Sequence, residues 1–295
     1  MWIGVDLGGT KIEGVLMDAT GAERVRRRHP TPRAQGYDAI VAAVADLALR
    51  LEGEAHAVCT IGVGTPGAVS RRTGLMKNCN TTALNGRPLH RDLERALGRE
   101  IRLENDANCF ALSEAHDGAA RGKRVVFGVI LGTGVGGGLV VDGQVHTGPN
   151  AIAGEWGHVV NDDQGPACYC GRRGCVETLL SGPAMAASYV EAGGESGLDA
   201  RAIAERAEAG EELASATLER WLEWFGRAMA VVVNVVDPDV IVVGGGLSGM
   251  PVVYRDGPGA VAKHVFSDDL RTPIVPNAHG DASGVRGAAR LWPVR

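Results

Sequence analysis

Both halves of the chain repeat one order of elements, and this repetition restricts the fold more than any other feature of the sequence. Residues 2–17 form two short apolar runs around a glycine turn at 8–10, which predicts a β-hairpin. Residues 125–145 repeat the pattern, with an apolar run, a glycine loop at 132–137 and a second turn at Asp142-Gly143. Two similar α/β domains are therefore expected.

Helices and further strands complete each half. Apolar residues at helical spacing predict helices at 37–52, 89–97, 107–115 and 218–236. Short apolar runs predict strands at 58–63, 101–103 and 240–243. A Gly/Ala/Arg-rich stretch at 117–123 separates the halves. We expect an N-terminal domain at 1–118, joined by a C-terminal helix at 283–295, and a C-terminal domain at 119–282.

Composition and charge narrow the class of protein. Apolar residues make up 45% of the 295 and charged residues 22%, as in an ordinary globular chain. The amino terminus has no basic segment followed by a long apolar stretch, and no apolar run approaches the roughly 20 residues of a membrane span. The net charge of -5 leaves no electrostatic footprint for nucleic acid. We therefore expect a cytoplasmic protein that binds neither nucleic acid nor a membrane.

The first glycine loop, DLGGTK at 6–11, combines groups that suit a phosphate. Glycines let backbone amides approach a phosphate closely, and the Thr10 hydroxyl can donate to it. Asp6 could hold a Mg²⁺ ion through water. The motif alone leaves a second interpretation open, a hairpin turn with incidental polar groups.

Two further glycine loops follow apolar strands. GTGVGG at 132–137 matches the dinucleotide pattern G-x-G-x-x-G, but a strand rather than a helix is predicted after it. We therefore reject a dinucleotide site and predict a phosphate-binding hairpin like the first. The third loop, 244–246, ends a buried strand where adenine or ribose could lie against bare backbone. Close packing of a helix on the strand is the alternative for this loop.

Six motifs together resemble the ROK family of sugar kinases. They are DLGGTK at 6–11, ENDAN at 104–108, GTGVGGG at 132–138, GEWGH at 154–158, CYCGRRGC at 168–175 and VIVVGGG at 240–246. The resemblance implies an α/β, two-domain actin/hexokinase-like (ribonuclease H-like) ATPase fold with the active-site cleft between the domains. Residues 77–89 and 279–293 look most like the manno(fructo)kinase type, with the N-acetylglucosamine kinases as close relatives.

The resemblance implies a reaction and its cofactors. It predicts ATP-dependent phosphorylation of a free hexose, fructose or mannose, to the hexose 6-phosphate. Kinases of N-acetylglucosamine or glucose are the alternative within the family. ATP and Mg²⁺ are the expected cofactors, and family members tend to form homodimers. The nucleotide would be bound by Asp6, Gly8, Gly9, Thr10, Lys11, Gly132, Thr133, Gly134, Gly136, Gly137, Gly244, Gly245 and Gly246.

Asp106 is the predicted catalytic residue. Phosphoryl transfer needs one base that takes the proton of the attacking hydroxyl, and the equivalent family position has that role. Asn105 beside it would hydrogen-bond a neighbouring hydroxyl. From the local sequence alone, Asn105 or Asp106 could equally be a helix N-cap. By resemblance, the hexose also contacts Asn80, Glu155, His158 and Glu177.

The clustered cysteines predict a metal site in the C-terminal domain. Cys168, Cys170 and Cys175 lie within eight positions, and His158 in GEWGH supplies a fourth ligand. A Cys₃His set leaves no open coordination position, so the ion would be a structural Zn²⁺. It would fix the wall of the sugar pocket that carries Glu155 and Glu177. A disulfide is disfavoured by a reducing compartment, and a group of buried free thiols is the remaining alternative.

Two proteins of other classes share these family features. One is a sugar-responsive repressor, which carries a DNA-binding domain ahead of the kinase-like body. Because the first strand is predicted to begin at Trp2, we expect no such domain ahead of it. The other is a non-catalytic sugar-binding protein, against which the intact glycine loops and Asp106 argue.

Overall fold

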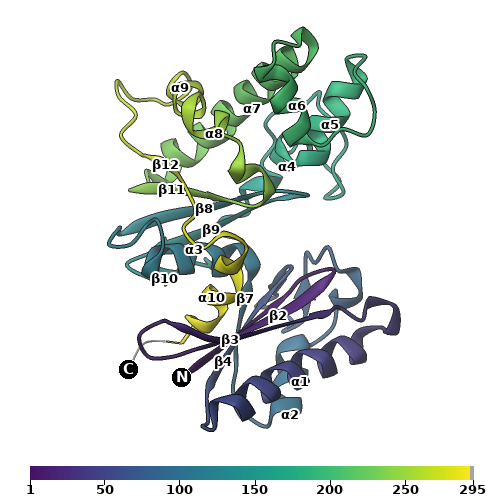
Figure 1. Ribbon diagram of the computed structural model, residues 1–295, viewed down its shortest axis with the longest axis vertical. Helices are drawn as coiled ribbons and strands as arrows, with labels where there is room; N and C mark the ends of the chain where they lie inside the picture. Colours follow the sequence, from purple (N-terminus) through teal and green to yellow (C-terminus); the bar gives the residue numbers. More distant parts are fainter. Residues whose placement is uncertain (293–295) are drawn as a thin grey trace. The chain divides into compact units, whose positions relative to one another are not determined.

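The structure is a computed structural model and describes residues 1–292. By its internal contacts it divides into two units. Unit 1 comprises Met1–Arg121, Gly138–Ala153 and the chain from Asp281 on, and unit 2 comprises Gly122–Gly137 and Gly154–Gly280. Two five-stranded mixed sheets with helices form the molecule (Figure 1), which confirms the predicted α/β class. The predicted domain bounds at 118 and 282 stay a prediction.

The first sheet lies in unit 1 and has the order β3-β2-β1-β4-β7. Its strands are β1 (Trp2–Leu7), β2 (Lys11–Met17), β3 (Glu23–Pro30), β4 (Thr60–Thr65) and β7 (Arg102–Asn105). The hairpin partners β1 and β2 are antiparallel, whereas β4 pairs parallel with both β1 and β7. The carboxyl ends of β1, β4 and β7 therefore meet at one edge of the sheet. A small two-stranded sheet, β5 (Ala68–Val69) and β6 (Met76–Lys77), follows β4.

Strand β3 was not expected from the sequence. Its segment ERVRRRHP carries four arginines and only one strongly apolar residue, Val25, so no apolar run marks it. It pairs antiparallel with β2 along its whole length and forms an edge of the sheet. Charged side chains on an edge strand hinder pairing with another chain. The strand is therefore defined by its partner β2 rather than by its own hydrophobic pattern.

Four helices of unit 1 pack around this sheet. They are α1 (Tyr37–Ala55), α2 (Leu89–Leu97), α3 (Asp106–Asp117) and α10 (Ser283–Ala289). Glycines let α10 lie directly on the strands, because a Cβ at Gly4 would be 2.0 Å from the carbonyl oxygen of Val285. The predicted helix at 283–295 is too long: the helix ends at Ala289, and 293–295 lie outside the described residues. Arg290 is already the C-cap of this helix, and its backbone amide donates to carbonyl groups of the last turn.

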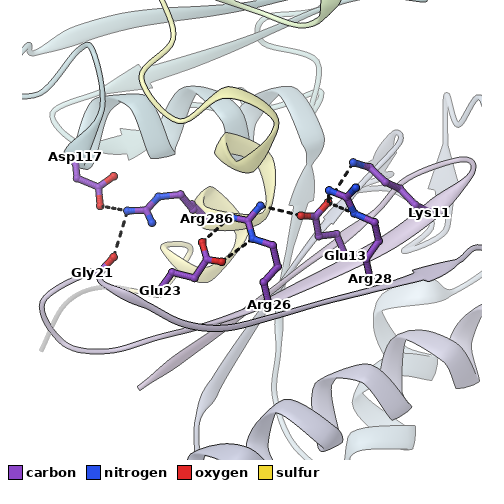
Figure 2. Close-up of polar contacts among 8 residues, drawn as sticks. All are labelled: Lys11, Glu13, Gly21, Glu23, Arg26, Arg28, Asp117 and Arg286. Atoms are coloured by element: carbon purple, nitrogen blue, oxygen red, sulfur yellow. Dashed lines mark hydrogen bonds and ion pairs between the residues drawn. The ribbon is translucent and has the colours of Figure 1, made fainter.

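Polar contacts fasten α10 to α3, the helix that begins at Asp106. Arg286 and Arg290 both donate to Asp117 Oδ2, at 2.8 and 3.0 Å. The hydroxyl of Ser283 donates to Glu114 at 2.8 Å. Arg286 also donates to the carbonyl of Gly21 (Figure 2). The carboxyl-terminal segment is thus part of the framework that holds α3.

The second sheet has the order β10-β9-β8-β11-β12. Its strands are β8 (Val125–Leu131), β9 (Val135–Val141), β10 (Gln144–Val145), β11 (Val240–Gly244) and β12 (Ile274–Pro276). The second glycine loop is shorter than predicted, because β9 already begins at Val135 and includes Gly136 and Gly137. The predicted turn at Asp142-Gly143 joins β9 to β10. The division between the units falls inside β9.

The helices of unit 2 include the long apolar helix that the sequence predicts. They are α4 (Val176–Leu180), α5 (Gly182–Glu191), α6 (Ala200–Glu208), α7 (Glu212–Val236), α8 (Val252–Arg255) and α9 (Gly257–Ala262). Trp221 and Phe225 of α7 are fully buried and stack with ring centroids 5.3 Å apart. The helix ends at Val236, and its C-cap Asp237 immediately precedes Pro238. None of the helices in residues 1–292 is long and apolar enough to cross a membrane.

Candidate active site

The first glycine loop is a tight turn that joins β1 to β2. The amide of Gly8 donates to the carbonyl of Lys11 at 2.9 Å. Thr31 fixes the turn from outside, because its hydroxyl donates to the carbonyl of Gly8 at 2.8 Å and its amide donates to Thr10. The Thr10 side chain itself is exposed. The turn is thus held by its carbonyl groups, which leaves the Thr10 hydroxyl facing solvent.

Asp6, at the end of β1, lies among other carboxyl groups of unit 1. Burial, followed by the nearby charges of Asp106 and Glu13, raises the pKa of Asp6 to about 7. A carboxyl group in this position is poorly compensated by the protein alone. A divalent cation would supply the missing positive charge, and carboxylate oxygens are the ligands that Mg²⁺ prefers. The residues present therefore fit a Mg²⁺ ion beside Asp6.

Asp106 is the first residue of α3, and Asn105 is its N-cap. Asn105 Oδ1 accepts from the amides of Ala107 at 2.9 Å and Asn108 at 3.3 Å. The N-cap interpretation is therefore right for Asn105, whose Nδ2 atom remains available to a ligand. Asp106 Oδ1 accepts from the amide of Ala107 at 2.7 Å. A helix amino terminus favours the ionised form of such a carboxyl group.

Glu104 is a residue of this region that sequence reasoning missed. Burial raises its pKa. Its Oε1 atom accepts from the amide of Asn105 at 2.9 Å and from Nδ2 of Asn108 at 3.1 Å. Glu104 therefore braces the residues on either side of Asp106. Its position in ENDAN, two residues before Asp106, was the available signal.

A cavity of about 190 Å³ in unit 1 lies beside Asn105. It is lined by Ala68, Val69, Arg71, Leu103, Glu104, Asn105, Thr147 and Ala151. Arg71 closes one side, since its Nη2 atom donates to the hydroxyl of Thr147 at 2.6 Å. The cavity combines an amide donor, a guanidinium and small apolar side chains, which is the mixture expected of a small polar ligand's pocket.

The segment with Asn80 approaches the first glycine loop. A Cβ placed on Gly9 would lie 3.5 Å from Thr81 Oγ1 and 4.0 Å from Arg33 Nη1. Asn80 precedes Thr81 and is exposed. Unit 1 therefore brings Asp6, Asn105 and Asp106 together with the glycine loop, and sets Asn80 next to it. Arg33, a cation at this loop, was missed because no motif includes it.

In unit 2, the second glycine loop contacts Glu177. Glu177, near the start of α4, accepts from the amide of Val135 at 3.0 Å. A Cβ on Gly134 would lie 2.7 Å from its Oε2 atom, so a larger residue there would displace this carboxylate. Trp156 donates from Nε1 to the carbonyl of Gly136 at 3.0 Å. The loop, Glu177 and the segment of Glu155 and His158 thus form one cluster in unit 2.

The four predicted metal ligands also come together in unit 2. The ligand atoms of His158, Cys168, Cys170 and Cys175 all lie within 4.8 Å of one another. Cys168 Sγ is 3.6 Å from His158 Nδ1, and the sulfurs of Cys170 and Cys175 are 3.6 Å apart. Tetrahedral zinc with Zn–S bonds of about 2.3 Å sets two sulfurs about 3.8 Å apart. The donor set and its spacing therefore fit Zn²⁺.

The cysteines of this cluster form no disulfide bonds. All six cysteines are free, so the disulfide alternative is wrong for this structure. Hydrogen bonds from Arg172 lower the pKa of the exposed Cys170 thiol to about 6. The thiolate is the form that binds a metal.

Tyr169, between two of the cysteines, is a second residue that the sequence reasoning missed. Its hydroxyl lies 2.9 Å from His158 Nε2, and the two rings meet edge to face with centroids 5.1 Å apart. A partner on Nε2 leaves Nδ1 directed at the thiols, as a metal ligand requires. Tyr169 thereby fixes the orientation of His158.

The third glycine loop lines a separate cavity of about 690 Å³ in unit 2. The cavity is lined by Gly132, Thr133, Gly182, Pro183, Ala186, Gly197, Leu198, Asp199, Ala200, Arg201, Gly246, Leu247 and Met250. It brings Gly132 and Thr133 of the second loop and Gly246 of the third loop to one cavity. Gly245 has a φ of +83°, and a Cβ there would lie 2.3 Å from the carbonyl oxygen of Leu131. Glycine is thus required at this strand end.

Solved structures of similar fold share this architecture. A ROK hexokinase from Thermus thermophilus is 34% identical, with a TM-score of 0.87 over 98% of this chain and 96% of that one. A ROK family glucokinase from Streptomyces griseus, solved with glucose and AMPPNP, is 28% identical, with a TM-score of 0.80 over 98% of both chains. The fold is therefore the two-domain, actin-like class of the ROK hexokinases and glucokinases.

Sequence comparison identifies the family. The ROK family model matches residues 2–295, so the chain belongs to the ROK family. An N-acetyl-D-glucosamine kinase of Photobacterium profundum is 38% identical over 99% of both chains. The enzyme of the same name from Citrobacter koseri is 39% identical over the same share. A ROK family transcriptional regulator, at 22% identity and a TM-score of 0.82, shows the fold alone.

Proposed function

We propose that this chain is a sugar kinase that transfers the γ-phosphoryl group of ATP to the 6-hydroxyl of N-acetyl-D-glucosamine. The observation that carries the proposal is Asp106 at the start of α3, beside Asp6, in a chain that aligns over 99% of its length with N-acetyl-D-glucosamine kinases. The fructose or mannose preference expected from residues 77–89 finds no support among these relatives. The alternative of an amino-sugar substrate fits them better.

Asp106 acts as the general base in this proposal. The hydroxyl of the sugar must lose a proton as its oxygen attacks phosphorus, and a carboxylate within hydrogen-bond distance accepts it. The amide of Ala107 fixes the orientation of Asp106 at the amino terminus of α3, where backbone N–H groups favour a negative charge. Asn105 donates from Nδ2 to a neighbouring hydroxyl while its Oδ1 caps the helix. Asn105 and Asp106 would thus both begin the helix and contact the substrate.

The nucleotide is bound by the three glycine loops. Backbone amides and the Thr10 hydroxyl of the first loop contact phosphate, and Lys11 adds positive charge. The second and third loops line the 690 Å³ cavity, whose small residues accept the adenosine. Asp6 would hold Mg²⁺, which neutralises charge that develops on the phosphates. The residues of the second loop continue into β9, so their amides are fixed by the sheet.

A structural Zn²⁺ would be held by His158, Cys168, Cys170 and Cys175. The ion orders a segment that has few regular elements between β10 and α4. Glu155 and Glu177 flank that segment and, with His158, contact sugar hydroxyls. We further propose that the enzyme is a cytoplasmic homodimer, which gel filtration with light scattering tests.

Sugar preference is the direct test of the proposed function. Turnover of Mg²⁺-ATP is followed by coupled ADP release with N-acetylglucosamine, glucose, mannose and fructose presented separately. The highest kcat/KM is expected on N-acetylglucosamine. A preference for fructose or mannose would restore the manno(fructo)kinase interpretation. Absence of turnover with all four sugars, in zinc-loaded protein that binds nucleotide, would favour a non-catalytic sugar-binding protein.

A further inference from the structure

Three charged residues form a row across the strands that lead into the first glycine loop. Asp6 of β1 is the register partner of Glu13 of β2, and Glu13 is the register partner of Arg28 of β3. Register partners on neighbouring strands point to the same face of a sheet. Lys11 lies two residues before Glu13 on β2 and therefore shares that face. Arg26 shares it in the same way, two residues before Arg28.

Glu13 is the buried centre of this row. Its exposed fraction is 1%. Its Oε2 atom lies 3.2 Å from Lys11 Nζ and accepts from Arg28 Nη2 at 2.9 Å. Its Oε1 atom accepts from Arg26 Nη1 at 2.9 Å. Figure 2 shows the three cations directed at the one carboxylate.

The carboxylate of Glu13 is ionised in this environment. Burial by itself would raise the pKa of Glu13, but the hydrogen bonds and charges of Lys11 and Arg28 outweigh it, and the pKa is lowered. A buried carboxylate that lost these partners would be costly. The cations around Glu13 therefore allow it to remain both buried and charged.

The cost of this arrangement indicates a use beyond holding the strands together. Like charges directly opposite in a sheet are destabilising, and Asp6 and Glu13 are such a pair. The hydrogen bonds of Arg26 and Arg28 to Glu13 already join β2 to β3. Lys11 contributes little to that joint, because its side chain is on β2 itself and is 37% exposed. Its contact with Glu13 instead restrains a flexible side chain next to the glycine turn.

We propose that Glu13 is a positioning residue that holds the Lys11 ammonium beside the first glycine loop, ready for the phosphates of the nucleotide. The inference rests on the proposed function, because it assigns a role in the same site. Lys11 pairs with a single carboxylate oxygen that Arg28 shares, so its remaining N–H groups are directed elsewhere. An anion at the loop would accept from them.

The test compares two carboxylates of one network. Glu13→Gln removes the charge that holds Lys11 and keeps the size of the side chain. Glu23→Gln is the matched control, because Glu23 pairs with Arg26 in the same network (Figure 2) but has no contact with Lys11. Binding of Mg²⁺-AMPPNP by calorimetry, KM for ATP, KM for the sugar and the melting temperature are measured for both. Glu13→Gln is expected to weaken nucleotide binding about tenfold, with the sugar KM unchanged. Glu23→Gln is expected to leave both nucleotide binding and the sugar KM unchanged.

A double-mutant cycle separates positioning from a purely structural role. In a Lys11→Met background, Glu13→Gln should weaken nucleotide binding no further, because the group that it positions is gone. An equal loss in both backgrounds, or equal values for Glu13→Gln and its control, would overturn the proposal. If Glu13→Gln fails to fold, Glu13→Asp keeps the charge but withdraws the carboxylate by one methylene. The same loss of nucleotide affinity is expected of it, and unchanged affinity would overturn the proposal.

The two proposals fail in different ways. Wild-type protein that binds AMPPNP but phosphorylates no sugar would contradict the proposed function, while the binding cycle would still decide the role of Glu13. Wild-type protein that binds no nucleotide would overturn both. Sugar phosphorylation with unaltered nucleotide binding in Glu13→Gln would overturn only the role of Glu13.

Discussion

The first and second glycine loops look alike in sequence, but the protein stabilises them by different means. The first is surrounded by charge: Asp6, Lys11, Glu13 and Arg28 lie on or beside its two strands. The second is surrounded by close contacts, with Trp156 against Gly137 and the carboxylate of Glu177 on the amide of Val135. A strand–glycine–strand motif therefore predicts a turn, whereas the tertiary structure decides whether mainly charged side chains or mainly close contacts surround it. Substitutions in the two loops should consequently affect different measurements.

Loss of the metal should have the largest effect. It should act on the second glycine loop and its surroundings, where close contacts dominate. Structural zinc contributes on the order of 10 kcal/mol to the ordering of small zinc-binding peptides. Cys175→Ser is expected to remove one equivalent of zinc and to lower the melting temperature strongly. Cys59→Ser, at a buried cysteine far from the cluster in sequence, is the control and should retain the metal. Metal analysis that finds no zinc in the wild-type protein would contradict the prediction.

Asp106→Asn should have the next largest effect. It should lower turnover through the charged groups beside the first glycine loop. Loss of a general base typically lowers turnover by about 10² to 10⁴. Because Asn can still accept from the amide of Ala107, α3 should remain intact and the melting temperature should change little. Nucleotide affinity should be similar to wild type. Asp46→Asn, on the exposed face of α1, is the control. A variant with normal turnover would exclude Asp106 as the base.

The smallest effects should come from one methyl group added to each loop. Gly137→Ala would set a Cβ 2.4 Å from Trp156 Cδ1 and 2.6 Å from the carbonyl oxygen of Gly154. Overpacking of this kind costs about 1–3 kcal/mol, so the melting temperature should fall. Gly9→Ala meets nothing closer than 3.5 Å, so stability should change by less than about 0.5 kcal/mol. The methyl group should nevertheless hinder approach of a phosphate to the backbone and raise KM for ATP.

The opposite effects of Gly9→Ala and Gly137→Ala would contradict the proposed difference between the two loops. If Gly9→Ala lowers the melting temperature as much as Gly137→Ala, the first loop is also held by packing. If Gly137→Ala raises KM for ATP without destabilising the protein, the second loop meets the phosphates as closely as the first. Thermal melts and ATP titrations of the two variants, run side by side, decide between these outcomes.

Much of the site was predictable because its parts are local in sequence. Helix α3 begins where a strand ends at ENDAN, so the sequence predicts an N-cap at Asn105 or Asp106, and the family resemblance points to Asp106 as the carboxylate of the site. The four metal ligands lie within 18 positions, and tight turns at Gly171 and Gly174 bring them together. Arg33 was missed because no motif includes it. Glu104 and Tyr169 lie inside quoted motifs and were missed because a single polar residue carries no periodic signal.

What the sequence determined by itself was therefore the set of elements with strong local patterns: the glycine turns, the apolar strands, the long stripe of α7 and the cysteine cluster. The tertiary structure decided the rest. Strand β3 exists because β2 offers it a partner, not because its own residues are apolar. The contact of Glu13 with Lys11 and Arg28 depends on the register of the strands. The packing of α10 against Gly4 brings together segments some 280 residues apart in the chain. Register and long-range packing bring together residues whose spacing along the chain carries no information about their distance.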